Sequence, residues 1–519
     1  MTIKEFIRRI QKHTYFPKYS NWIFVLLIVI FCAVYNYQDI LFYAPQSIHH
    51  WRQCDCLSIT MNYYQDNNPF FTPSVHYLGW DATGKTVSDF PLVYFSVAQL
   101  WKVFGHHEFI YRLVVLLLFV SGLFALFKIF ENTLRDSVLA IICSLLMFTS
   151  PTLAYYANNF LMDIPALSLA IAGLYYFFRF SQSSENKHLY LLAFFYALAG
   201  LLKISSLLGF MAILGLFILE LFNVKVMPGR KIFQHPGKQI FPLTGVIVVQ
   251  LIWLIYASSY NARYNGGIFL IGILPIWDLS LAEIKTTLNA INEHIKWDYF
   301  RKETQIVFAF MFVSILVFFK RMNKVMFFLT IFISTGFLFF SLLFFQALKD
   351  HDYYTINLFV LVPVVFLSFL ILLKDKYHAV YASVFFRIIL IVFLIHNLDF
   401  ARIRIESRYK QTGWQNRNYI EMIQPFKEIT PYLRSVGIQK TDRVISLSDN
   451  SINVSLYLMN QKGWTNYGIS ADSIKIKEKI NLGAKYLFIY NQKDYEEPGI
   501  QPFIKKKIGE FKNIDIYEL

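Results

Sequence analysis

The stretch FIYRLVVLLLFVSGLFALFKIFE at residues 109–131 decides the fold. Its only charged residues are Arg112 near the start and Lys128 and Glu131 near the end. A helix of about 20 apolar residues crosses the hydrocarbon core of a bilayer, because each residue adds about 1.5 Å of length. We therefore interpret this segment as a transmembrane helix.

Similar apolar segments recur along the chain, which has 519 residues, 56% of them hydrophobic and 16% charged. Together they predict a polytopic α-helical membrane protein with about eleven crossings. The first segment lacks a small-residue cleavage site after it, so we interpret it as a signal anchor. The predicted crossings lie near residues 21–37, 109–131, 136–154, 163–180, 188–202, 204–223, 240–258, 304–319, 325–346, 353–373 and 379–397.

The character of the chain changes after Asp399, where polar and charged residues become frequent. Short alternating runs such as RVISL at 443–447 and KYLFIY at 485–490 indicate strands between helical stretches. The sequence therefore predicts two domains, a transmembrane domain over residues 1–398 and a soluble α/β domain over residues 399–519.

Basic residues predict how the chain is oriented in the membrane, because Lys and Arg gather in cytoplasmic loops. Alternate loops carry them, at Lys225 to Lys238, Lys320 to Lys324 and Lys374 to Lys376, and so does the segment before the first crossing, with Lys4, Arg8, Arg9, Lys12 and Lys18. An odd number of crossings then puts the C-terminal domain outside, which in a bacterium is the periplasm. The net charge of +15 is ascribed to these loops and to anionic lipid, with no nucleic-acid partner.

The long first loop, residues 38–108, falls on the outer side and contains the polar stretch HHWRQCDCLSIT at 49–60. We expect amphipathic helices around 50–64 and 91–104, which lie along the membrane surface. Three more polar features fall on the same side, namely Asp163, Lys203 and the stretch 349–354. Polar residues gathered at one membrane depth predict a single functional site.

These polar stretches resemble the glycosyltransferases of the C type, which use polyprenyl-phosphate sugars. The most similar branch is the bacterial group that includes protein O-mannosyltransferase-like enzymes and the aminoarabinose transferases of lipid A. The motifs that carry the resemblance are HWRQCD at 50–55, DFPL at 89–92, NFLMDIP at 159–165, GLLK at 200–203 and HDYY at 351–354. The first loop has one aspartate between two cysteines where relatives often have an acidic pair. Many relatives also read KPPL where this chain has DFPL, and QKGW at 461–464 is similar to a segment in some of them.

The resemblance implies that residues 1–398 form a catalytic domain in the inner membrane, with its active site on the extracytoplasmic side. Transfer needs cations for the leaving phosphate and a base for the acceptor hydroxyl, and Asp55 is the candidate base. Transfer is expected to invert the anomeric centre. The candidate substrate-binding residues are His50, Arg52, Gln53, Lys85, Asp89, Asp163, Lys203, His351, Asp352, Tyr353 and Tyr354.

Each candidate also has a purely structural interpretation. Arg52 and Asp55 are spaced as an ion pair on a helix surface. Asp163, followed by Pro165, is typical of a helix start with an aspartate N-cap. Lys203 is placed either to extend its ammonium to the membrane surface or to pair with Asp163 or a phosphate. The stretch 351–354 has the composition of an interfacial aromatic belt.

No metal site is predicted. Cys54 and Cys56 point in different directions on a helix, and His49 with His50 is too loose a pattern for zinc. The cofactor remains unknown, and a divalent cation stays open because some relatives use one.

The expected partners are a polyprenyl-phosphate sugar donor, an extracytoplasmic protein, lipid or glycan acceptor, and membrane lipids. Three other functions remain open: an oligosaccharide ligase with a diphosphate donor, a transporter or flippase of lipid-linked sugars, and a non-catalytic scaffold. The predicted crossings show no twofold repeat of hydropathy, and this argues against a transporter.

Overall fold

The computed structural model describes residues 14–269 and 271–519. Lys4, Arg8, Arg9 and Lys12 lie outside the described residues. The chain is divided into two compact units that alternate along the sequence. The first comprises Met1–Leu41, Arg112–Trp253 and Gly272–Glu406, and the second comprises Phe42–Tyr111, Leu254–Ile271 and Ser407–Leu519.

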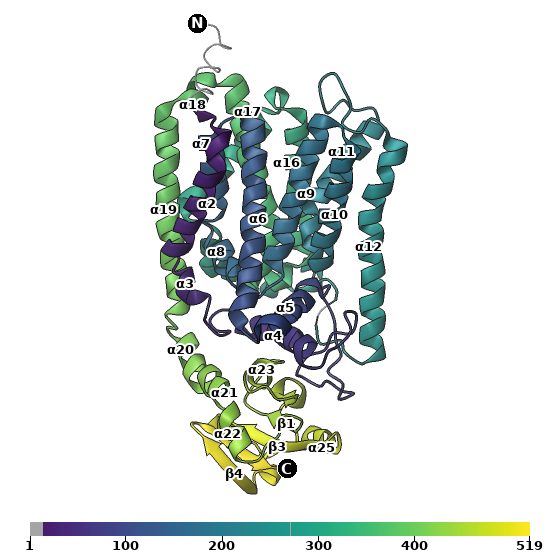
Figure 1. Ribbon diagram of the computed structural model, residues 1–519, viewed down its shortest axis with the longest axis vertical. Coiled ribbons are helices and arrows are strands. Elements are labelled where there is room, and N and C mark those ends of the chain that lie inside the picture. Colours follow the sequence, from purple (N-terminus) through teal and green to yellow (C-terminus); the bar gives the residue numbers. More distant parts are fainter. Residues whose placement is uncertain (1–13, 270) are drawn as a thin grey trace. The chain divides into compact units, whose positions relative to one another are not determined.

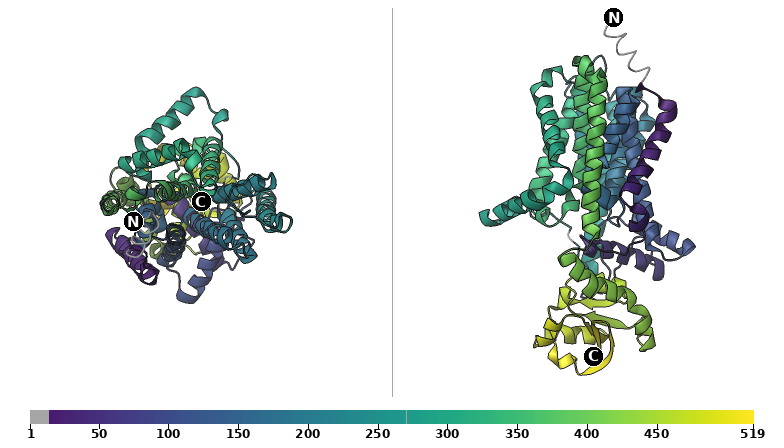
Figure 2. Two further views of the ribbon diagram at one scale, coloured as in Figure 1. Left: turned by 90° about the horizontal axis from the view of Figure 1, so that it is seen from above. Right: turned by 90° about the vertical axis from the view of Figure 1, so that its left-hand side faces the viewer.

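The first unit is helical, and its long helices lie side by side (Figures 1 and 2). Three helices, α6, α12 and α19, continue from it into the second unit. The elements are α2 (Pro17–Val34), α3 (Tyr37–Ile40), α6 (Glu108–Leu134), α7 (Ser137–Met147), α8 (Pro151–Ala157), α9 (Asp163–Ser183), α10 (Asn186–Leu202), η1 (Ile204–Leu207), α11 (Leu208–Leu221), α12 (Pro236–Arg263), α13 (Leu281–Ala290), α14 (Lys296–Tyr299), α15 (Lys302–Val317), α16 (Lys324–Leu343), η5 (Phe345–Lys349), η6 (Asp352–Val360), α17 (Leu361–Lys376), α18 (His378–Ala382) and α19 (Val384–Tyr409).

Each of the eleven predicted crossings coincides with a helix, but the described residues contain 8 helices that are long and apolar enough to span a membrane, or 9 if a bent pair counts as one span. Helix α10 has 17 residues and α15 has 16, so both are short for a crossing. The predicted segment 136–154 is the bent pair, in which α7 and α8 meet at 79°. Pro151 at the start of α8 lacks the N–H that would continue α7.

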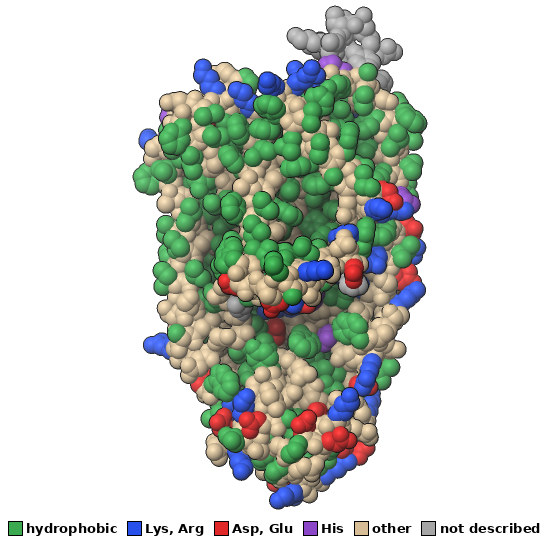
Figure 3. All heavy atoms as spheres, turned by 180° about the vertical axis from the view of Figure 1, so that it is seen from behind, with side chains coloured by type: hydrophobic (Ala, Val, Ile, Leu, Met, Phe, Trp, Pro, Cys, Tyr) green, Lys and Arg blue, Asp and Glu red, His purple; other side chains and the backbone are tan. Residues whose placement is uncertain are grey.

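The surface of the first unit fits a lipid environment. Large apolar side chains such as Trp22, Phe241 and Phe385 are more than two-thirds exposed. Figure 3 shows hydrophobic side chains over this unit and a row of Lys and Arg side chains at one end. The loop between α11 and α12 and the turn between α17 and α18 lie at that end (Figure 1). The chain is a multi-pass membrane protein, with basic loops gathered as the sequence predicts.

The second unit contains the sheet and the helices of the first loop. Helices α4 (His50–Gln65) and α5 (Leu92–Phe104) confirm the two helices predicted there. The sheet has the order β2-β1-β3-β5-β4, in which β1 is parallel to β2 and β3, and β5 is antiparallel to β3 and β4. Its strands are β1 (Arg443–Ser446), β2 (Gly463–Thr465), β3 (Ala484–Ile489), β4 (Lys506–Phe511) and β5 (Ile514–Glu518). Strands β1 and β3 confirm the two runs identified in the sequence.

Several short helices precede or separate the strands of this sheet along the sequence. They are α20 (Trp414–Asn418), α21 (Gln424–Glu428), α22 (Thr430–Ser435), α23 (Val454–Leu458), α24 (Asn466–Ile469) and α25 (Ser473–Asn481). Helix α19 runs through the domain boundary predicted at residue 399 and ends at Tyr409. That boundary stays a prediction.

The first loop is joined to the sheet by backbone hydrogen bonds. Tyr77 forms a parallel bridge with Gly463, the N–H of Leu78 donates to the carbonyl of Gly463 at 2.8 Å, and the N–H of Gly463 donates to the carbonyl of His76 at 3.1 Å. The indole N–H of Trp464 donates to the carbonyl of Gly79 at 2.7 Å. Residues 76–79 therefore extend the sheet beyond β2, and the first loop and the C-terminal segment fold as one unit.

Candidate active site

Asp55, the candidate base, lies on α4 with only 6% of its surface exposed. Its Oδ1 accepts a hydrogen bond from Asn453 Nδ2 at 2.8 Å. Burial raises the pKa of Asp55 to about 6, against the lowering effects of the Arg52 charge and of the Asn453 hydrogen bond. A carboxyl group with a pKa near neutrality takes up and releases a proton readily, as a general base must.

Arg52 pairs with Asp89 rather than with Asp55. Arg52 Nη2 lies 2.5 Å from Asp89 Oδ2, and the hydroxyl of Tyr94 donates to the same oxygen at 3.0 Å. The guanidinium also lies over the ring of Phe269, 5.2 Å from its centre. The ion pair expected on the helix surface is therefore replaced by a pair between α4 and the DFPL motif. A phosphate bound by Arg52 would compete with Asp89.

His50 and Gln53 hold the turn that precedes α4. Gln53 Nε2 donates to the carbonyls of Gln46 at 2.9 Å and Ile48 at 3.1 Å. The ring of His50 makes hydrogen bonds of 3.1 Å with the carbonyl of Ser47 and with Asn418 Nδ2. Burial lowers the pKa of His50 to about 4, so the ring is neutral at physiological pH. Both side chains position α4.

Lys85 is half-buried, and its ammonium lies 4.2 Å from the centre of the Tyr264 ring. Residues next to it are fixed by Asn261, which accepts from the N–H of Val87 at 2.9 Å and donates to its carbonyl at 2.8 Å. A cation over an aromatic ring keeps its charge available to an anion that approaches from the other side.

In the first unit, Asp163 and Lys203 lie together. Asp163 is the first residue of α9 and is 3% exposed, and its Oδ2 lies 4.0 Å from Lys203 Nζ. The expected N-cap role is wrong, because Met162 occupies the cap position and no side chain caps the helix. A carboxylate in the first turn still favours the helix dipole. Of the pairings that the sequence left open for Lys203, the one with Asp163 is present, and the one with a phosphate stays a prediction.

The stretch 351–354 leads into η6, which begins at Asp352 and packs against α9 and η1. Asp352 is buried and accepts a hydrogen bond from the Tyr156 hydroxyl at 2.5 Å. The His351 ring stacks on Tyr354, with the ring centres 5.4 Å apart, and lies 5.3 Å from Tyr353. The segment therefore combines a buried acid with an aromatic stack, and its role in binding the sugar or phosphate stays a prediction.

The predicted residues thus fall into two groups. The first unit holds Asp163, Lys203 and residues 351–354, and in it Asp163 and Lys203 lie together. The second unit holds His50, Arg52, Gln53, Asp55, Lys85 and Asp89. That all of them serve one site stays a prediction.

Several polar partners of these residues were not identified from the sequence. Asn453 is separated from Asp55 by 398 positions. Tyr156 is likewise distant from Asp352, and Asn357 donates to Ser205 at 3.1 Å beside Lys203. No local spacing relates such pairs, so only the fold reveals them.

Cys54 and Cys56 are both buried, and neither forms a disulfide. Cys56 Sγ lies 3.7 Å from the Tyr94 hydroxyl. Within the described part of the chain, no group of three or more His, Cys, Asp or Glu side chains is arranged to hold a metal ion. The question of a divalent cation stays open.

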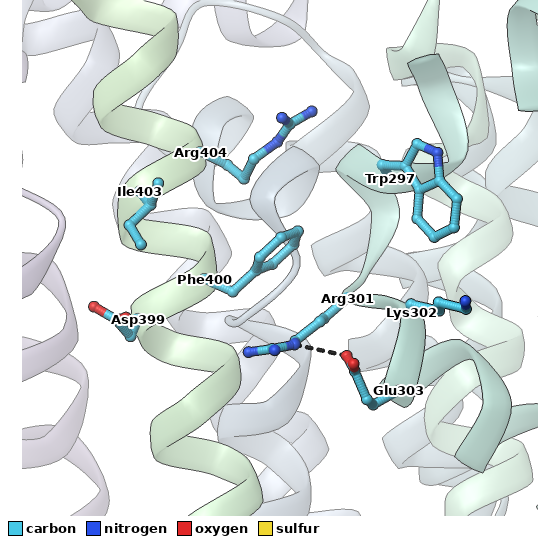
Figure 4. Close-up of a pocket in the computed structure, with 8 residues that line it drawn as sticks. All are labelled: Trp297, Arg301, Lys302, Glu303, Asp399, Phe400, Ile403 and Arg404. Atoms are coloured by element: carbon cyan, nitrogen blue, oxygen red, sulfur yellow. Dashed lines mark hydrogen bonds and ion pairs between the residues drawn. The ribbon is translucent and has the colours of Figure 1, made fainter. Parts of the chain in front are cut away.

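A separate cavity of about 360 Å³ lies between the α14–α15 segment and α19 (Figure 4). Its charged groups are mixed in sign and partly paired, with Arg301 Nε 2.6 Å from Glu303 Oε2 and Arg404 donating to Asp298 at 2.7 Å. None of the predicted site residues lines this cavity, whose walls are formed by Trp297, Arg301, Lys302, Glu303, Asp399, Phe400, Ile403 and Arg404.

Comparison with known proteins gives one family match and several structures of similar fold. Residues 88–256 match the family described as dolichyl-phosphate-mannose-protein mannosyltransferase. The crystal structure of ArnT from Cupriavidus metallidurans bound to undecaprenyl phosphate is similar, with a TM-score of 0.61, 11% identity, and coverage of 96% of this chain and 98% of that chain. The apo state of ArnT gives the same score and identity over 95% and 98% of the two chains.

No curated protein sequence matches significantly. At 11% identity the structural likeness is one of fold, and it extends over nearly the whole chain. Together with the family match, it confirms the resemblance to the C-type glycosyltransferases.

Proposed function

We propose that this chain is an integral membrane glycosyltransferase that transfers a sugar from a polyprenyl-phosphate donor to an extracytoplasmic acceptor, with Asp55 as general base. The observation that carries the proposal is the buried carboxyl of Asp55, whose pKa of about 6 suits proton transfer near neutral pH. It lies in a chain that has the fold of ArnT, a protein crystallised with undecaprenyl phosphate.

The reaction makes one bond and breaks one. The acceptor oxygen attacks the anomeric carbon of the sugar, the bond from that carbon to the phosphate oxygen breaks, and Asp55 takes the acceptor proton. The polyprenyl phosphate leaves with the bonding electrons, and the anomeric configuration is inverted by attack from the opposite face.

The departing phosphate gains negative charge, which nearby cations stabilise. Lys203 and Lys85 are the proposed ligands, since Arg52 is engaged by Asp89. Asp163 would hold Lys203 in place between turnovers. His351, Asp352, Tyr353 and Tyr354 would contact the sugar or its phosphate, and His50 and Gln53 would act by holding α4.

We place the first loop and the segment after residue 399 on the outer face of the inner membrane, with about eleven crossings in total. The soluble α/β domain then faces the periplasm. The acceptor is a protein, a lipid or a glycan that is exposed there.

The test is mass spectrometry of membrane lipids from cells that lack the gene and from the same cells complemented with wild type, Asp55→Asn or Asp66→Asn. We expect a polyprenyl-phosphate sugar to accumulate in the deletion strain and with Asp55→Asn. Asp55→Asn should reduce turnover on the order of a hundredfold or more. Asp66 directly follows α4 and pairs with Lys462 at the surface, so Asp66→Asn is the matched control and should restore normal lipids.

Other outcomes would change the assignment. Accumulation of a polyprenyl-diphosphate oligosaccharide would indicate a ligase. Movement of labelled lipid across vesicles of purified protein, without any sugar transfer, would indicate a transporter. Normal lipid composition with Asp55→Asn would remove Asp55 from the mechanism.

A further inference from the structure

The loop that follows β1, residues 447–453, is fixed around the carboxylate of Asp449. This carboxylate is 1% exposed and accepts four hydrogen bonds, from the N–H groups of Ser451 and Ser455 at 2.8 Å and from their hydroxyls at 2.6 Å. The Ser451 hydroxyl in turn accepts from the N–H of Val454 at 2.9 Å. An anion with this many donors makes the loop rigid and sets the start of α23.

Asn453 ends this loop and is completely buried. Its Nδ2 donates to Asp55 Oδ1 at 2.8 Å, and its Oδ1 accepts from the backbone N–H of Tyr77 at 3.0 Å. The Tyr77 N–H fixes which way the amide points, because the flipped amide would bring two donors face to face. Asn453 therefore presents a donor to Asp55.

Two more groups complete this arrangement. The Ser58 hydroxyl lies 3.3 Å from Asn453 Oδ1 and accepts from the N–H of His76 at 2.8 Å. Ser58 lies one turn beyond Asp55 on α4, on the side that meets α23. The amide is thus held by the first loop at one end while it contacts the candidate base at the other.

We propose that Asn453 is a positioning residue for the sugar-transfer reaction and that, through it, the C-terminal segment forms part of the catalytic apparatus. The inference rests on the proposed role of Asp55 as base. Asn453 fixes Oδ1 of the carboxylate. Among the residues that the structure describes, Oδ2 makes no hydrogen bond, so Oδ2 is the oxygen that takes the acceptor proton.

The hydrogen bond also stabilises the charged form of Asp55 against the effect of burial. The charged groups that act on Asp55 are Arg52 on its own helix and Asp449 in the loop before α23. His76, behind Ser58, is neutral at physiological pH because burial lowers its pKa to about 3. Loss of the Asn453 donor should therefore raise the pKa of Asp55.

The test uses membrane vesicles from the deletion strain, supplied with the lipid donor that accumulates there, and variants of the full chain. Asn453→Leu keeps the size of the side chain and removes the donor. We expect a loss of turnover on the order of tenfold or more. The acid limb of the pH profile should also move upward by about one pH unit. Asn450→Ala, in the same loop but exposed, is the control and should leave rate and profile unchanged.

A double variant separates positioning from a general effect on folding. In an Asp55→Asn background, Asn453→Leu should cause little further loss, because there is no base left to position. A further loss as large as in the wild-type background would overturn the inference, and so would an unchanged acid limb in Asn453→Leu.

If Asn453→Leu does not fold, Asn453→Ser is the second variant, since it retains a donor but shortens its reach. It should show an intermediate displacement of the acid limb, and an unchanged limb would again overturn the inference. Failure of the proposed function looks different, since then Asp55→Asn itself retains wild-type turnover.

Discussion

At the scale of single residues, the state of Asp55 should govern how the reaction depends on pH. Burial raises the pKa of this carboxyl to about 6, so it is mainly ionised at neutral pH, and the base is lost by protonation as pH falls through that value. We expect the transfer rate to fall about tenfold for each pH unit below about pH 6 and to level off above it. The check is the rate in membrane vesicles between about pH 5 and about pH 8. The residual activity of Asp55→Asn should lack this limb, and a limb of the same shape in that variant would assign it to another group.

Lys203 gives a second prediction at this scale, because its ammonium has two proposed partners, the donor phosphate and Asp163. Lys203→Met removes the positive charge that lies 4.0 Å from the buried Asp163 carboxylate. We expect a loss of about 1–2 kcal/mol in stability, less than for a fully buried pair because the lysine is 22% exposed. Asp163→Asn in the same chain should restore thermal stability but not donor affinity, while Lys203→Arg should keep part of that affinity. Equal donor affinity in wild type and Lys203→Met would mean that another group binds the phosphate.

At the scale of elements, Gly463 decides whether β2 can lie beside both β1 and the first loop. A methyl group added there would lie 1.8 Å from the carbonyl oxygen of Val444, which is backbone and has no room to move. Gly463→Ala should therefore destabilise the second unit by about 1–3 kcal/mol and weaken its protection from protease. Gly245→Ala in α12 is the control, since the added methyl meets nothing within 4 Å. Equal thermal unfolding of the two variants would contradict the tight approach of β2.

Elements also differ in how far the sequence predicts them. Each long apolar run of the sequence coincides with a helix in the structure. Such runs can be predicted because length and hydrophobicity are local properties of the sequence. The bend at Pro151 was missed because hydropathy is continuous across residues 136–154, although the proline itself marks the break. Motifs identified Asp55 and Arg52, but the partners that fix their chemistry, Asn453 and Asp89, are set by packing between distant segments. Asp163 is a residue type that often caps helices, but here it is the first residue of α9, after the cap position.

For the whole molecule, the orientation in the membrane is the main prediction. Basic loops gather at one end of the first unit (Figure 3), so that end should face the cytoplasm. An impermeant thiol reagent applied to intact cells should label Asn450→Cys, which is exposed in the second unit, and should not label Arg230→Cys. Both should react after the cells are opened, and the wild type, whose cysteines are mostly buried, is the blank. The reverse pattern of labelling would invert the topology.

The hydrogen bond between Asp55 and Asn453 also bears on how the protein is made. Asp55 leaves the ribosome early, but its partner is synthesised 398 residues later, after all the candidate membrane-spanning helices of the described residues. The carboxylate therefore acquires its final surroundings only when the C-terminal segment has been synthesised and has paired with residues 76–79. We therefore expect a nascent or truncated chain that lacks Asn453 to be inactive, so that unfinished copies do not consume donor lipid.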